Sequence, residues 1–104
     1  MPNGKRGEVW IVDLGMAAKI RPCVIVSIPI EDQDRALVTL IPHTTSVRGS
    51  RFEVAIAVPG LERGAFDVQN VVTVPIVKLV RKTAKLSDGD LQTLSRELGT
   101  WLGL

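Results

Sequence analysis

The sequence of 104 residues has no tyrosine, one cysteine and one histidine. A single cysteine, Cys23, excludes an intramolecular disulfide, and with the lone His43 it excludes a zinc site of cysteines and histidines. One histidine also excludes acid–base catalysis by a pair of histidines. No apolar run approaches the ~20 residues of a membrane helix, and the polar residues 1–9 do not resemble a signal peptide. These absences predict a protein of the reducing cytoplasm that uses no membrane, metal or cofactor.

The composition is that of one folded domain, which we expect to span residues 1–104. Hydrophobic residues make up 45% of the chain, and 13 lysines and arginines against 11 acids leave a net charge of only +2. A disordered polyelectrolyte is therefore excluded. Because so small a domain buries a low fraction of its surface, this apolar content predicts an apolar face covered by a second copy, and hence a homodimer.

Most of the chain has the pattern of short strands separated by turns. Five segments are predicted strands: 9–14, 23–28, 36–41, 51–58 and 67–74. The near-continuous apolar run 23–28 is typical of a strand buried on both faces, with Cys23 as a small buried hydrophobe. Pro42 is expected to end the third strand, and residues 76–81 fit either a short strand or a helical turn.

The last part of the chain changes to a helical period. Ser87 and Asp90 resemble a capping box that starts a helix. Apolar residues then recur at helical spacing: Leu91, Leu94, Leu98, Trp101 and Leu102. Short strands with turns about every ten residues, followed by one amphipathic helix, predict a mainly β fold, namely a small antiparallel barrel with a C-terminal helix.

Two polar segments beside prolines are the candidates for a functional site. Arg21 precedes Pro22 at the entry to the second strand, and residues 43–46, His-Thr-Thr-Ser, follow Pro42 at the end of the third. Alone, an arginine in such a place is usually a solvated charge, and Thr44 suits a turn in which its hydroxyl satisfies the backbone. Composition and spacing therefore predict only a small barrel with a polar loop cluster.

Five segments in series resemble one known family. They are GEVWIVDL (7–14), RPCVIVS (21–27), VTLIPHTTS (38–46), RFEVAI (51–56) and AKLS (84–87). In order, spacing and total length the chain is similar to the MazF/PemK toxins, the ribonucleases of type II toxin–antitoxin modules. The most specific elements are the Arg-Pro that opens the second strand and the P-x-T-T that ends the third.

The resemblance implies an SH3-like or CcdB-like barrel, a homodimer, and metal-independent cleavage of single-stranded RNA, such as mRNA, at specific sequences. In this family the ribose 2′-oxygen attacks the adjacent phosphate, which leaves 2′,3′-cyclic phosphate and 5′-hydroxyl ends. The family's catalytic pair corresponds to Arg21 and Thr44. A guanidinium and a hydroxyl suit this chemistry, because both donate hydrogen bonds to the negative charge that develops on the phosphate oxygens.

Neighbouring residues are weaker candidates for the same site. His43, Thr45 and Ser46 are candidates for catalysis or RNA binding. The ordinary pKa of histidine suits a general base, but strand alternation turns His43 away from any pocket that Thr44 faces. Three cations near these segments are candidates for contacts with RNA phosphates: Lys19, Arg48 and Arg51.

Two departures from the family pattern affect the expected RNA sequence more than the chemistry. The loop 15–20 is short and lacks the acid that relatives carry there. Residues 69–73, Gln-Asn-Val-Val-Thr, stand where relatives have an acid and an arginine.

A cognate antitoxin with an acidic, partly disordered tail is the expected partner, besides the RNA. Two alternatives use the same barrel: a gyrase-binding toxin of the CcdB kind that acts through its C-terminal residues, and a non-catalytic barrel that binds RNA or protein.

Overall fold

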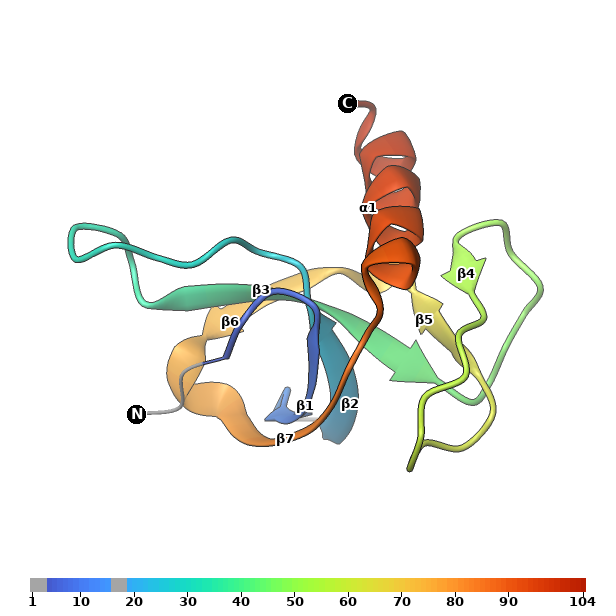
Figure 1. Ribbon diagram of the computed structural model, residues 1–104, viewed down its shortest axis with the longest axis horizontal. Coiled ribbons are helices and arrows are strands. Elements are labelled where there is room, and N and C mark those ends of the chain that lie inside the picture. The colour runs from blue at the N-terminus through green and yellow to red at the C-terminus, as the bar shows by residue number, and fades with distance from the viewer. Residues whose placement is uncertain (1–3, 16–18) are drawn as a thin grey trace.

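The computed structural model describes residues 4–15 and 19–104, and it is built on antiparallel strands with one α-helix (Figure 1). The elements within these residues are β1 (Glu8–Asp13), β2 (Ile20–Ile25), β3 (Leu37–Thr44), β4 (Glu53–Val54), β5 (Ala65–Asp67), β6 (Val72–Pro75), β7 (Leu79–Lys85), α1 (Asp88–Leu102) and the 3-10 turns η2 (Val68–Asn70) and η3 (Ile76–Lys78). The strand order is β4-β5-β3-β2-β1-β7, with β6 also paired to β3. The sheet is not closed, and the predicted mainly β, barrel-like fold with a C-terminal helix is confirmed.

Strand β3 organises the sheet, because three strands pair with it. β2 pairs along one side of β3, while β6 and then β5 pair along the other. The expectation that Pro42 ends this strand is wrong, since β3 continues to Thr44. Pro42 lies between Leu40, the last partner of β6, and His43, the first partner of β5. Between β6 and β5, the edge of β3 at Pro42 has no partner strand among the described residues that needs an N–H donor. Proline, which lacks an N–H group, is therefore tolerated there.

Three other strands differ from their predicted bounds, because an apolar pattern reports burial rather than pairing. The strand expected at 67–74 is divided among the end of β5, the turn η2 and the start of β6. The strand expected at 23–28 is Ile20–Ile25, since its register with β1 begins at the pair Asp13 and Ile20. The segment 51–58 alternates between exposed and buried residues as predicted, yet only Glu53 and Val54 pair. Its partner β5 is three residues long, so the rest of the segment is extended chain without a ladder.

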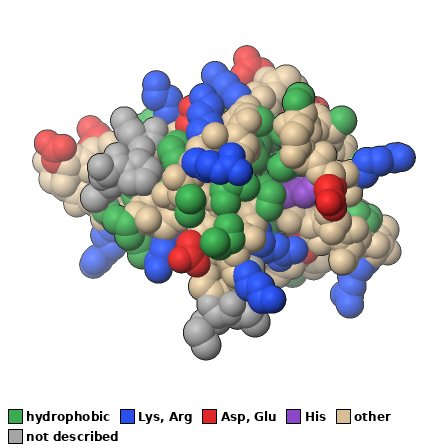
Figure 2. Space-filling view, turned by 90° about the horizontal axis from the view of Figure 1, so that it is seen from below, with side chains coloured by type: hydrophobic (Ala, Val, Ile, Leu, Met, Phe, Trp, Pro, Cys, Tyr) green, Lys and Arg blue, Asp and Glu red, His purple; other side chains and the backbone are tan. Residues whose placement is uncertain are grey.

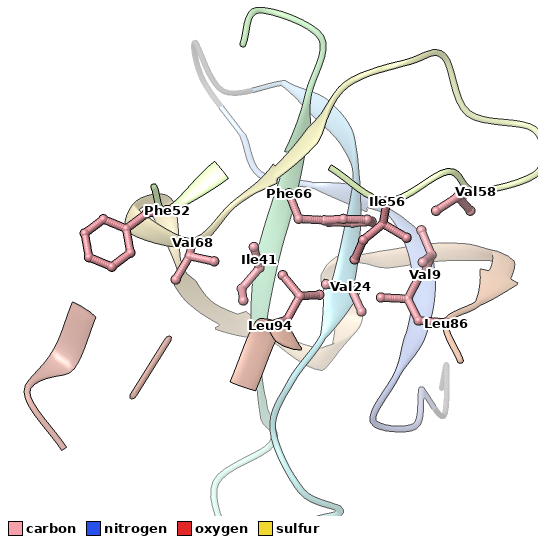
Figure 3. Close-up of a cluster of buried hydrophobic side chains, with 10 residues drawn as sticks. All are labelled: Val9, Val24, Ile41, Phe52, Ile56, Val58, Phe66, Val68, Leu86 and Leu94. Carbon is pink, nitrogen blue, oxygen red and sulfur yellow. The ribbon is translucent and has the colours of Figure 1, made fainter. Parts of the chain in front are cut away.

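The core has two apolar clusters, one on each face of the β1–β2–β3 sheet. Figure 3 shows the first, in which Val24 of β2 and Ile41 of β3 meet Leu94 of the helix. Cys23 and Leu40 belong to the second cluster, together with Leu79 of β7. Strand β2 is therefore buried on both faces, as its apolar run predicts. Cys23 is fully buried, which confirms the expected core position, and burial raises the pKa of its thiol to about 12.

Helix α1 begins and ends with the expected caps. The Ser87 Oγ atom accepts a hydrogen bond of 3.2 Å from the Asp90 backbone N–H, as the capping motif predicts. Leu91 and Leu94 are buried against the sheet, and Gly103 ends the helix in the left-handed conformation. No helix in residues 4–15 and 19–104 is long and apolar enough to cross a membrane.

Candidate active site

A surface depression of about 400 Å³ lies where β2 begins and β3 ends. It is lined by Ile11, Ile20, Arg21, Pro22, His43, Thr45, Gly60, Leu61 and Glu62. Figure 2 shows this face, with the histidine in purple between hydrophobic side chains and an acidic side chain. The structure thus brings together Arg21, His43 and Thr45, which the sequence places in two separate segments.

Arg21 and Thr44 lie level with each other on neighbouring strands. The β2–β3 ladder ends at the pair Cys23 and Pro42. If the same register is continued by two residues along each strand, Arg21 comes opposite Thr44. Side chains at opposed positions share a face of the sheet. Both residues are half-buried, and Arg21 also borders the depression. Arg21 thus lines the depression, whereas Thr44 is not among its lining residues.

The hydroxyl of Thr44 is oriented by a local turn. Its Oγ1 atom accepts a hydrogen bond of 3.0 Å from the backbone N–H of Ser46, so the turn anticipated from the sequence is present. A hydroxyl has one donor hydrogen and two acceptor lone pairs. The turn uses one lone pair only, which leaves the O–H hydrogen free to donate to a ligand.

His43 is a buried side chain that lines the depression, on the opposite face of β3 from Thr44. Its ring is 5% exposed and stands edge-to-face against Phe66, with 5.1 Å between the ring centroids. The Nε2 atom is buried without a hydrogen-bond partner among the described residues. Burial, followed by the positive charge of Arg21, lowers the pKa of His43 below its ordinary value of 6.5, so the imidazole is neutral at pH 7.

Gly64 allows the chain to pack against the end of β3. A Cβ atom at this position would overlap the carbonyl oxygen of Thr44 and would come within 2.9 Å of Cε1 of His43. A residue with a side chain would therefore push β5 away from β3 or displace the ring of His43. The contact explains why glycine precedes β5.

The three cations predicted to bind RNA do not line the depression. Lys19 is exposed at the entry to β2, in a left-handed conformation with φ of 56°. The guanidinium of Arg51 lies 4.6 Å from the ring centroid of Phe52, and the Phe52 ring also contacts Trp101 of α1. Arg51 is thus engaged with the helix side of the molecule, and only Lys19 lies next to the residues of the depression.

Arg48 belongs to a loop that Glu53 holds together. The Glu53 carboxylate accepts hydrogen bonds from the backbone N–H groups of Arg48 and Ser50, at 2.9 and 2.7 Å. These bonds hold the pKa of Glu53 below its ordinary value. The exposed Arg48 and Ser46 therefore stand on an ordered loop that follows β3.

Leu61 and Glu62 are site residues that sequence reasoning missed. They follow the turn at Pro59 and Gly60, and they reach the depression because β5 pairs with the end of β3. The Pro-Gly signal predicted a turn, but nothing local indicates which strand end that turn faces.

The two departures from the family pattern are only partly visible. In the loop 15–20, residues 16–18 lie outside the described residues, while the Lys19 carbonyl accepts a 2.9 Å hydrogen bond from Leu14 N–H. The segment 69–73 spans the end of η2 and the start of β6, and its Thr73 contacts Thr39. Within the described part of the chain no three His, Cys, Asp or Glu side chains converge as a metal site would require.

Comparison with known proteins supports the fold and gives the family of the chain. The model of a family described as "PemK-like, MazF-like toxin of type II toxin-antitoxin system" matches residues 5–102. No curated protein matches the sequence.

Solved structures resemble the whole chain. A structure named Mycobacterium tuberculosis toxin MazF-mt6 is 29% identical, with a TM-score of 0.78 over 93% of this chain and 97% of its own. An endoribonuclease in complex with its cognate antitoxin, from Mycobacterial species, is 25% identical, with a TM-score of 0.79 over 100% and 97% of the two chains. A MazE-MazF structure from Deinococcus radiodurans is 17% identical and shares the fold, with a TM-score of 0.83 over 100% and 99%.

Proposed function

Because the chain belongs to the family of PemK-like, MazF-like toxins of type II toxin–antitoxin systems, we propose that it is an endoribonuclease that cleaves single-stranded RNA at specific sequences. A structural neighbour that is 25% identical over the full chain bears the name endoribonuclease, which supports the proposal. The observation that carries it is the placement of Arg21 level with Thr44, beside a depression at the sheet end. The family match favours this activity over the gyrase-binding and non-catalytic alternatives.

The reaction is a transesterification within the RNA. The ribose 2′-oxygen forms a bond to the adjacent phosphorus, the bond from phosphorus to the 5′-oxygen breaks, and one proton passes in net from the 2′-hydroxyl to the leaving oxygen. Arg21 donates two parallel hydrogen bonds to the negatively charged phosphate oxygens, and the Thr44 hydroxyl donates one more. No step uses a metal-bound water, so we expect cleavage to persist in EDTA.

We assign His43 to the wall of the site rather than to proton transfer. Its Nε2 atom is buried, and a general base must come within hydrogen-bond reach of the proton that it removes. Thr45 lines the depression next to it, and we assign contacts with flanking nucleotides to the exposed residues Ser46, Lys19 and Arg48. We place the reaction in the cytoplasm, where mRNA is the substrate.

Two protein partners complete the proposal. A cognate antitoxin with an acidic tail would cover the site, in keeping with the antitoxin complex of a structural neighbour and with the positive charge of Arg21 in the depression. A second copy of the chain would cover exposed apolar residues such as Val77 and Val80, which are 62% and 54% exposed. In sedimentation we therefore expect the mass of a dimer, and the mass of one chain at micromolar concentration would contradict it.

Single-turnover cleavage of a short oligonucleotide tests the assignment of the site. Arg21→Ala is expected to lower the rate ~10²–10³-fold, with little change in affinity for a 2′-deoxy analogue that cannot react. Arg21→Lys should restore little, because an ammonium lacks the planar pair of donors. Arg81→Ala, on the exposed part of β7, is the matched control and should cleave normally.

Thr44 is tested in the same assay. Thr44→Val keeps the shape and removes the donor, so the rate should fall roughly ten- to a thousandfold, whereas Thr44→Ser should retain much of it. Thr93→Val on α1 is the control. If Arg21→Ala cleaves at nearly the wild-type rate while His43→Ala is inactive, the assignment is wrong and His43 is the catalytic base.

A further inference from the structure

The depression beside Arg21 has one feature that phosphate chemistry does not explain, which is the carboxylate of Glu62 at its edge. A carboxylate accepts hydrogen bonds only, and it repels the phosphates that Arg21 attracts. Glu62 is exposed, and within the described residues its side chain has neither a hydrogen bond nor an ion pair. It is therefore available to a ligand group that donates hydrogen bonds.

The position of Glu62 is fixed by the chain on both sides. On one side, the Leu61 N–H donates a 3.0 Å hydrogen bond to the Val58 carbonyl, and Gly60 has a φ of 88°, which together form a tight turn with Pro59 at its second position. On the other side, Gly64 packs on the Thr44 carbonyl. The loop thus fixes the backbone that carries Glu62 at the edge of the depression.

The walls of the depression are apolar, and its size suits a small planar group. Ile11, Pro22 and Leu61 line it, together with the neutral imidazole of His43. Its volume of about 400 Å³ falls in the range of small-molecule sites, which is roughly 300–1,000 Å³. An unstacked RNA base offers apolar faces for such walls and a hydrogen-bonding edge for the rim.

We propose that this depression is a base-binding subsite that selects guanine through the carboxylate of Glu62, an inference that rests on the proposed RNA cleavage. Guanine presents two parallel donors, N1–H and the N2 amino group, on its Watson–Crick edge, and a carboxylate presents two parallel acceptors. Adenine and cytosine present one donor group beside an acceptor, and uracil presents one donor between two carbonyls. Guanine is the base that satisfies both carboxylate oxygens.

The subsite also predicts where guanine stands in the cleaved sequence. Arg21 borders the depression and also contacts the scissile phosphate in the proposed reaction. A base in the depression therefore belongs to a nucleotide that flanks this phosphate. Guanine should occur immediately before or immediately after the cut.

The test is sequencing of the 5′-hydroxyl ends that the full chain and its variants produce from a mixed-sequence RNA. The wild type should cut next to guanine. Glu62→Gln replaces one acceptor with a donor. The resulting amide can pair with a donor and an acceptor on the Watson–Crick edge of any base, so the preference for guanine should be lost. Glu62→Ala should lose the preference without gaining another. Glu31→Gln, an exposed acid on the β2–β3 loop, should cut as the wild type does.

Rates on defined oligonucleotides give the size of the effect. Inosine lacks the N2 amino group, so replacing the flanking guanine with inosine should slow the wild type about tenfold to a hundredfold, and it should slow Glu62→Ala little. Cleavage without guanine at the cut, or an unchanged preference in Glu62→Gln, overturns the subsite and leaves the ribonuclease intact. A complete lack of new 5′-hydroxyl ends overturns the proposed function and the subsite with it.

Discussion

Glu8 is the charged residue whose effect on stability can be worked out most directly from the structure. It is 8% exposed at the start of β1, and its carboxylate joins three parts of the chain. Oε1 accepts hydrogen bonds from the Lys5 backbone N–H at 2.8 Å and from Trp10 Nε1 at 3.1 Å. Oε2 lies 2.9 Å from Nζ of Lys82 on β7. The carboxylate therefore ties the N-terminal segment to both strands of the β1–β7 pair.

The pKa of Glu8 gives the magnitude. Burial alone would raise it, but the hydrogen bonds from Lys5, Lys82 and Trp10, with the charge of Lys82, lower it from 4.5 to about 2. At about 1.4 kcal/mol for each pH unit, the ionised carboxylate stabilises the folded chain by about 3 kcal/mol. Because the folded pKa is the lower one, this stability is complete above pH 4.5 and is lost as the pH falls toward 2.

Glu8→Gln tests this value through the free energy of unfolding in urea, measured from pH 7 down to pH 2. At pH 7 the variant should be less stable by about 3 kcal/mol, or by about 10–20 °C in melting temperature. The difference should shrink below pH 4.5 and vanish near pH 2. Glu31→Gln, an exposed acid, is the control and should change stability little. A Glu8→Gln deficit that stays constant across this range would refute the electrostatic reasoning and would indicate a purely steric effect.

Two further variants probe the packing at the end of β3. Gly64→Ala should lower the stability by about 1–3 kcal/mol, measured in thermal melts, because its methyl group overlaps the Thr44 carbonyl. It should also lower the rate of RNA cleavage. The control Gly89→Ala lies in open space on α1 and should be neutral or stabilising in the same melts. Wild-type stability should also decline below pH 6.5, because the histidine binds a proton in the unfolded chain while the lowered pKa of His43 keeps it neutral in the folded chain. His43→Gln should remove that part of the pH dependence, and an unchanged slope between pH 6.5 and 5 would contradict the burial of a neutral ring.

The parts of the fold that the sequence predicts are those that local chemistry determines. Helix α1 follows from the cap at Ser87 and the spacing of its leucines, since capping and periodicity are properties of neighbouring residues. The burial of β2 on both faces follows from its apolar run. The strand bounds do not follow, because pairing partners decide them: β3 passes Pro42 only because two different strands flank that point.

The candidate site divides in the same way. Arg21 and Thr44 are found from short motifs, and the β2–β3 register then places them level with each other. The motifs fix the residue types but carry no information on which face of β3 meets the depression, and the structure assigns that place to His43 and Thr45.

The residues that complete the site come from a part of the chain with no functional motif, and the reason is topological. Phe66 and Ala65 pair with His43 and Thr44, so the two-stranded β4–β5 unit is attached to the same short stretch of β3 that carries Thr44, whose hydroxyl we propose to be catalytic. This pairing places the loop before β5 beside the depression, whichever residues the loop contains. If Glu62 selects the base as we propose, a change at this single loop position can alter the base that is read, while the strands that carry the motifs keep Arg21 and Thr44 for the proposed cleavage.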